Sequence, residues 1–252
     1  MIQATKQIVS GFAAYPKAVR LIIANKLGKY LALPVVLNIV VVVALVFAGY
    51  GLGDWLSALI ERHTENMNGW IEAAMIAIKI VLPVIFFIVF IFIGGTIVNV
   101  LMSPIYTMLS EKAETLLTGK EFPFSARQTA KDIWRALRIA LKNTFKQLLL
   151  TFLCLFLNFI PVIGSVVSIG LIFVINAYYF GSGFMDYTFE RWRYSVEDSG
   201  KATGRLKFLA ITNGAVYSLP LYLFCGTFIA AFIGGVSAVA ATISQIELKA
   251  KE

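Results

Sequence analysis

The chain of 252 residues is 59% hydrophobic, and only 14% of its residues are charged. Because a soluble domain carries roughly a quarter charged residues, this composition excludes an ordinary water-soluble protein. The formal net charge is +8, but the basic residues gather in loops predicted to face the cytoplasm, so nucleic acid is not an expected partner.

Four long stretches contain no Asp, Glu, Lys, Arg or His: residues 30–53, 80–110, 148–185 and 208–246. Each exceeds the ~18 residues that indicate a membrane span. Together they predict an all-α integral membrane protein that forms a single membrane domain over residues 1–252. The first stretch begins too late for the apolar core of a cleavable signal peptide, so we expect it to be a retained anchor.

The charges of the loops predict the orientation of the chain. Residues 1–29 contain five basic residues and no acid, residues 54–79 contain four acids and two bases, and residues 103–147 contain eight bases and four acids. Because basic loops remain in the cytoplasm, we expect the N-terminus inside and full crossings at about residues 30–53 and 80–102. An inverted chain, or insertion both ways, is the alternative.

Residues 148–185 and 208–246 have lengths that suit neither one crossing nor two. A straight helix of either stretch would be ~57 Å long at ~1.5 Å per residue, against a hydrocarbon core of ~30 Å. Pro161, Gly164 and Pro220 interrupt them near the middle, where proline ends helices and glycine permits a tight reversal. We therefore predict two helical hairpins that partly penetrate the membrane; six shorter full crossings are the alternative.

The tip of the first predicted hairpin is the candidate pore region. Irregular backbone at membrane depth is tolerated where it is buried in protein or lines a wet cavity. We therefore expect the hairpin tips to meet each other, a partner subunit or a pore. Free backbone donors at the start of the second half-helix would also suit an anion. The candidate tip and pore residues are Asn158, Pro161, Gly164 and Ser165.

Residues 126–147 predict an amphipathic helix at the bilayer surface, with Trp134 at the level of the lipid headgroups. Contact with anionic lipid is the favoured function of its basic face, and attraction of an anionic substrate is the alternative. Its apolar residues at helical spacing are Ile133, Leu137, Leu141, Phe145 and Leu148, flanked by Lys131, Arg135, Arg138, Lys142 and Lys146.

Small residues four apart form a ridge late in the chain, at Ala230, Gly234, Ala238 and Thr242. Such ridges let helices approach closely in lipid. Packing inside the subunit and a subunit interface are both open.

A charged group follows the first hairpin and consists of Asp186, Glu190, Arg191 and Arg193. It is interpreted either as a gate or an ion-pair network at a cytoplasmic mouth or as a solvated turn, and a solvated turn is the more frequent outcome. Glu111 and Glu114 are expected to be surface residues.

The sequence gives no support for an enzyme. His63 is the only histidine, Cys154 and Cys225 lie in apolar stretches, and no phosphate-binding loop, dinucleotide fingerprint or nucleophile motif is found. We therefore expect no catalytic residues, no metal and no cofactor.

Five motifs follow one another along most of the chain. They are Leu-Pro-Val-Val-Leu-Asn at 33–38, Ser-Pro then Glu and Leu-Thr-Gly within 103–119, Phe-Ile-Pro-Val-Ile-Gly at 159–164, Asp-Tyr-Thr-Phe-Glu at 186–190, and Gly-Ala then a proline and a small-residue run within 214–242. In this order the chain resembles the CysZ-type sulfate permeases, which are grouped with the etoposide-induced proteins.

The resemblance implies two long transmembrane helices plus two partly penetrating helix pairs. It also implies a homo-oligomer in the bacterial inner membrane that takes up sulfate for cysteine synthesis without an ATPase domain. Members of the family bind sulfate near a basic pair just before the Leu-Pro element, and the matching positions here are Gly28 and Lys29. One base of the pair is missing, and Lys26 is the candidate replacement. Thr188 also stands where the family has proline.

Two alternatives to sulfate uptake stay open. The first is a membrane scaffold or remodelling protein without a transported substrate, which the predicted hairpins and the basic amphipathic helix would also suit. The second is a transporter of another oxyanion, such as sulfite, thiosulfate or molybdate.

Overall fold

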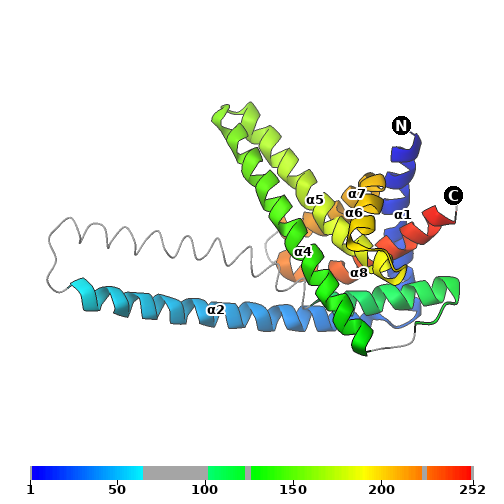
Figure 1. The fold of residues 1–252 in the computed structure, drawn as a ribbon, viewed down its shortest axis with the longest axis horizontal. Helices are drawn as coiled ribbons and strands as arrows, with labels where there is room; N and C mark the ends of the chain where they lie inside the picture. The colour runs from blue at the N-terminus through cyan, green and yellow to red at the C-terminus, as the bar shows by residue number, and fades with distance from the viewer. Residues whose placement is uncertain (1, 65–101, 123–125, 223–225, 251–252) are drawn as a thin grey trace. The chain divides into compact units, whose positions relative to one another are not determined.

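A computed structural model of the chain describes residues 2–64, 102–122, 126–222 and 226–250, and all regular structure within them is helical. This confirms the predicted all-α class. The helices are α1 (Ile2–Ala24), α2 (Gly28–Thr64), the segment 102–118, α4 (Ala126–Leu155), the 3-10 turn η1 (Phe156–Phe159), α5 (Ile163–Arg191), α6 (Val196–Arg205), α7 (Lys207–Ser218), the 3-10 turn η2 (Leu219–Tyr222) and α8 (Gly226–Lys249) (Figure 1).

The chain divides into two compact units. One consists of Met1–Val35 and Val100–Glu252, and the other of Val36–Asn99, so that α2 begins in the first unit and continues into the second. The crossing predicted at 30–53 lies on α2, whereas most of the crossing predicted at 80–102 lies outside the described residues. The features discussed below all belong to the first unit.

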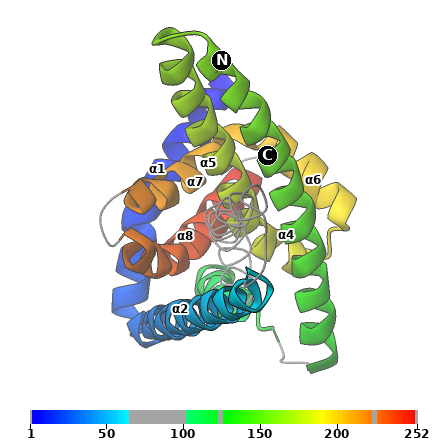
Figure 2. The ribbon, with the colours of Figure 1, turned by 90° about the vertical axis from the view of Figure 1, so that its left-hand side faces the viewer.

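Two helical segments of the described chain are long and apolar enough to cross a membrane, Trp134–Phe159 and Ile163–Arg191. They form an antiparallel pair, α4 with η1 against α5, which Figures 1 and 2 show from two sides. The predicted surface helix 126–147 and the first arm of the predicted hairpin are therefore one continuous helix, α4. The reason is local, since α4 contains neither proline nor glycine and nothing interrupts it at residue 148.

Close backbone contacts hold α5 against α7. A Cβ placed on Gly181 would lie 1.8 Å from the carbonyl oxygen of Ala210, and one on Gly214 would lie 1.7 Å from that of Ala177. Each helix thus presents a glycine where the backbone of the other passes. Only hydrogen in place of a side chain allows this approach.

The described side chains of the small-residue ridge on α8 pack inside the subunit. A Cβ on Gly234 would lie 2.4 Å from the hydroxyl of Tyr106, and Ala238 and Thr242 are fully buried. The ridge therefore accommodates the segment 102–118, which carries Tyr106.

The chain from 208 to 246 folds into α7, η2 and α8, and Pro220 lies within η2, where α7 has ended. α7 contacts α8, and η2 packs against α8. The sequence signal at Pro220 thus coincides with the break between two helices.

Candidate functional site

The residues predicted to bind the anion lie where α1 gives way to α2. Residues 25–27 form a turn in which Lys26 has a positive φ of 53°, and the buried Leu27 anchors the turn. Gly28 is the first residue of α2, and Lys29 is exposed in its first turn. The structure therefore brings Lys26, Gly28 and Lys29 together on a single short, basic surface.

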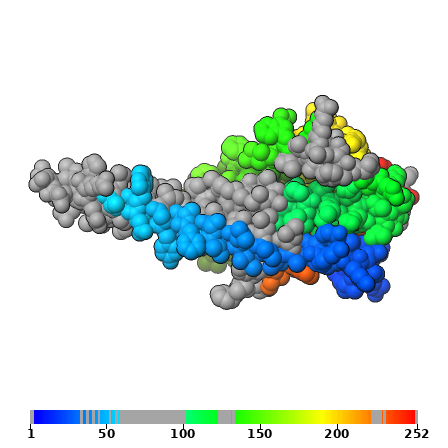
Figure 3. Space-filling view, turned by 90° about the horizontal axis from the view of Figure 1, so that it is seen from below, coloured from blue at the N-terminus to red at the C-terminus, as the bar shows by residue number. Residues whose placement is uncertain are grey.

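Tyr30 joins this surface to a second chain segment. Its ring has two ammonium groups near it, Lys29 Nζ and Lys112 Nζ, each 5.2 Å from the ring centroid. Such distances permit cation–π attraction, worth about 0.5–1 kcal/mol at an exposed site. Figure 3 shows the segment 102–118, which carries Lys112, directly beside the start of α2. Sequence reasoning did not select Lys112.

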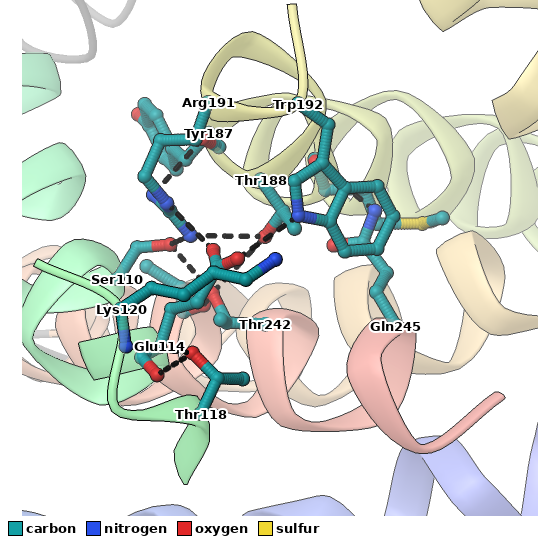
Figure 4. Close-up of polar contacts among 12 residues, drawn as sticks. Ser110, Glu114, Thr118, Lys120, Tyr187, Thr188, Arg191, Trp192, Thr242 and Gln245 are labelled. Carbon is teal, nitrogen blue, oxygen red and sulfur yellow. Dashed lines mark hydrogen bonds and ion pairs between the residues drawn. The ribbon is translucent and has the colours of Figure 1, made fainter. Parts of the chain in front are cut away.

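A buried polar group, here called the Glu114–Arg191 cluster, lies between the segment 102–118, α5 and α8 (Figure 4). The guanidinium of Arg191 donates to Glu114 at 2.8 Å and to Ser110 at 2.8 Å, and the indole N–H of Trp192 donates to the other oxygen of Glu114 at 3.0 Å. Thr242 of α8 lies 2.5 Å from Ser110 and 3.1 Å from Thr188. The side chains of the pair are 6% and 3% exposed, so water cannot replace either partner.

A second ion pair lies on the neighbouring face of α5. Arg135 of α4 donates to both oxygens of Asp186, at 2.6 and 3.0 Å, and to the hydroxyl of Ser199 at 2.7 Å. Glu190 lies 3.8 Å from the same guanidinium. This two-pronged contact fixes the base of α4 to α5 and α6.

These contacts decide between the two interpretations of the charged residues. Asp186, Glu190 and Arg191 form an ion-pair network, whereas Arg193 is exposed. The expectation that Glu114 lies on the surface is wrong, because Glu114 is 2% exposed. The sequence signal for this network was the two acids four residues apart on α5, Asp186 and Glu190. Their basic partner, Arg135, lies far away in the chain.

The charge of the buried network does not suit a bound anion. It contains three carboxylates, of Glu114, Asp186 and Glu190, against the two guanidiniums of Arg135 and Arg191. An added dianion would meet an excess of negative formal charge at low dielectric. The basic surface around Lys29 is electrostatically the better place for one.

The tip of the α4–α5 pair uses its polar groups to shape the turn. The amide of Asn158 donates to the carbonyl of Leu155 at 3.0 Å and to Ser168 at 3.3 Å. A Cβ on Gly164 would lie 1.8 Å from the carbonyl oxygen of Leu157, so the two arms almost touch there. Pro161 is exposed and Ser165 is half-buried.

The tip also contains a strained backbone. The N–H of Ile163 donates to the carbonyl of Pro161 at 2.7 Å, which closes a three-residue γ-turn around Val162. Val162 has φ 64° and ψ −65°, the rarer and more strained form of this turn. Around the turn the large apolar side chains are exposed, by 82% for Phe159 and 78% for Val162.

No group of three His, Cys, Asp or Glu side chains in the described part of the chain gathers as metal ligands would. Asp186 and Glu114 each form an ion pair with an arginine instead.

Comparison with known proteins assigns the family. A family model described as sulfate transporter CysZ/etoposide-induced protein 2.4 matches residues 14–243. The chain belongs to this family. The match begins within α1 and covers α2 and every later helix of the described chain down to most of α8, so the basic surface and the buried network both lie within it.

Bacterial proteins named sulfate transporter CysZ are similar to this member of the CysZ/etoposide-induced protein family. The one from Pectobacterium atrosepticum is 28% identical over 202 residues, covering 79% of this chain and 72% of that protein. Those from Vibrio parahaemolyticus and Vibrio atlanticus are 24% and 23% identical, over 75% and 83% of this chain and 76% and 82% of theirs. The resemblance found in the motifs is therefore confirmed.

Proposed function

We propose that this chain is a sulfate-uptake permease of the bacterial inner membrane that supplies sulfur for cysteine synthesis. Its relatives carry the name sulfate transporter. The observation that carries the proposal is Lys29, an exposed cation in the first turn of α2 that forms no salt bridge with any described residue. Its charge is thus available to an anion.

The start of α2 suits the chemistry of sulfate. Sulfate is a compact dianion, and a helix N-terminus offers it free N–H groups and partial positive charge. Gly28 has no side chain of its own to cover this backbone, and a Cβ there would have no atom within 4 Å. Lys26, in the preceding turn, adds to the positive potential at the same end of the helix.

The α4–α5 pair supports the membrane part of the proposal. Its outward side chains are large and apolar, among them Phe145, Phe152 and Val166, each more than half exposed. Water would not stabilise such a surface, but lipid or a second subunit would. We include in the proposal that both late stretches are partly penetrating hairpins of a multi-pass, homo-oligomeric protein.

We include the four tip residues in the proposal. They shape the membrane end of this hairpin, which we place beside the ion path. Asn158 donates to Ser168 across the two arms, and Gly164 lets the arms approach closely. Pro161 follows the last turn of the first arm, and Ser165 lies in the first turn of the second. Their contacts favour this shaping function over direct contact with the ion.

Uptake of radioactive sulfate into proteoliposomes tests the proposal. We expect flux above that of protein-free vesicles, and about tenfold weaker sulfate binding in Lys29→Gln, the effect of losing one charge-assisted hydrogen bond. Lys6→Gln, which removes an exposed charge elsewhere on α1, is the matched control. Folded protein that neither carries nor binds sulfate would contradict the proposal and favour the scaffold; flux of sulfite, thiosulfate or molybdate alone would favour another oxyanion.

A further inference from the structure

The basic surface at the start of α2 has a gap at Gly28. A Cβ at this position would have no atom within 4 Å, so space for a side chain exists and is not filled. Lys26 and Lys29 lie on either side of the gap, and Lys29 alone is held against an aromatic ring. One fixed ammonium group is a weak match for an anion with two charges.

Lys112 reaches the same place from another part of the chain. Its Nζ lies at the same distance, 5.2 Å, from the Tyr30 centroid as Lys29 Nζ does. The two nitrogens are therefore no more than twice that distance apart. Two ammonium groups repel each other, and neither forms a salt bridge with a described acid, although the carboxylate of Glu111 offsets part of the charge of Lys112. An anion bound by both would relieve the remaining repulsion.

Packing of neighbouring side chains holds the start of α2 against the segment 102–118. A Cβ on Gly235 of α8 would lie 2.2 Å from the side chain of Leu31 and 3.0 Å from that of Leu109. Leu31, next to Tyr30, and Leu109, one turn before Lys112, thus rest on the same glycine, and both are buried. The start of α2 and the segment 102–118 are therefore held side by side by this packing.

We propose that Lys112 and Lys29 form a two-cation site for a tetrahedral oxyanion with two negative charges, in which Lys112 supplies the charge that Gly28 lacks. This rests on the proposed function, since it names the second binding group of the same site. The backbone N–H groups of Gly28 and Lys29 complete the site, since that of Tyr30 already donates to the carbonyl of Leu27. The Tyr30 ring centroid lies 5.2 Å from both ammonium groups. Lys112 favours a dianion over a monoanion of the same shape, because its ammonium group attracts the monoanion less strongly.

Calorimetric binding to the full-length protein in neutral detergent at low ionic strength tests this proposal. Sulfate and perchlorate are the probes, because both are tetrahedral and they differ by one charge. We expect Lys112→Gln to weaken sulfate binding about tenfold and perchlorate binding clearly less. Lys120→Gln, an exposed lysine just beyond the same helix, should leave both affinities unchanged.

A compensating variant makes the test independent of folding. Because space is free at Gly28, Gly28→Lys in the Lys112→Gln background should restore sulfate affinity and the preference over perchlorate. Full sulfate affinity in Lys112→Gln overturns the proposal, as does equal weakening of the two anions, while loss in Lys29→Gln alone would leave the proposed function intact. If wild type binds no sulfate, the proposed function fails first.

Anionic lipid headgroups share the chemistry of the ligand and need a separate measurement. Flotation with vesicles of phosphatidylcholine, with and without phosphatidylglycerol, compares wild type and Lys112→Gln. We expect no difference between the two proteins. A loss of binding to the anionic vesicles, with sulfate affinity retained, would assign the lysine pair to lipid and overturn the proposal.

Discussion

The two ends of α5 differ in a way that a soluble helix would not. Near the hairpin tip, Val166 and Ile169 are 69% and 68% exposed, whereas near the base Met185 and Phe189 are buried together with the charged Asp186 and Glu190. One end places its apolar side chains outward, and the other places its charges inward. We therefore expect apolar surroundings for the tip, whereas the base is held by ionic contacts inside the subunit.

α4 shows the same arrangement, with apolar side chains outward and polar side chains inward. Its apolar Leu141, Phe145 and Phe152 face outward, while Arg135 and Gln147 turn toward α5, to Asp186 and Asn176. A helix with polar contacts inside and apolar side chains outside matches a membrane environment better than an aqueous one.

The largest effect is expected from removing the acid of the Glu114–Arg191 cluster at the base. Glu114→Ala leaves Arg191 buried without its partner, which costs about 3–5 kcal/mol of the free energy of unfolding. Thermal unfolding in detergent measures it. Glu197→Ala, which breaks the exposed pair with Lys201, is the control and should cost about 0.3–0.5 kcal/mol. Equal shifts for the two variants would show that the buried pair does not stabilise the base.

A second effect is expected where α5 crosses α7. Gly181→Ala would place a methyl group against the carbonyl of Ala210 and should destabilise the fold by about 1–3 kcal/mol or more. Gly183→Ala lies two residues away with no atom within 4 Å, and should stabilise the helix by up to about 1 kcal/mol. A shift of the unfolding midpoint in the same direction for both alanine variants would contradict this prediction.

At the tip the expected change is smaller and has the opposite sign. Val162→Gly releases the positive φ of the γ-turn, and after the entropy cost of glycine we expect a gain of about 1 kcal/mol. Val166→Gly, in the first turns of α5, should instead lose about 1 kcal/mol. A destabilised Val162→Gly would indicate that packing around Val162 outweighs its strain.

The smallest effect concerns pH and Glu111. Burial raises the pKa of Glu111, although the charges of Arg191 and Lys112 oppose this. A raised carboxyl pKa means that the folded state binds the proton more tightly, so stability falls as pH rises from the ordinary value of 4.5 through the folded pKa. Glu111→Gln should therefore raise the unfolding midpoint at pH 7 and change it little at pH 4. An equal gain at both values would contradict this.

The sequence predicted the helical class, the chain breaks near Pro161 and Pro220, and the family, because these depend on local signals. Continuity of α4 was also readable, since no proline or glycine occurs within it. What could not be read was which charges are buried. Glu114 and Arg191 lie 77 positions apart, and neither looks different from a surface residue until the helices meet.

The candidate site shows the same division. Lys29 and Gly28 followed from a motif, and they do lie at the start of α2. Lys112 depends on the packing of Leu31 and Leu109 on Gly235, a contact among three distant segments that leaves no periodic pattern. The family resemblance thus pointed to one half of the proposed anion site, and tertiary packing supplies the other.

The hydrogen bond between Gln147 and Asn176, 2.7 Å long, has a consequence for how the protein is made. If the α4–α5 hairpin enters the bilayer as proposed, either arm alone would carry an unpaired amide into hydrocarbon, which costs several kcal/mol. In the pair, the amide N–H of Gln147 and the amide oxygen of Asn176 satisfy each other. We therefore expect the two arms to leave the insertion machinery for the lipid as a preformed pair, after Asn176 has been synthesised.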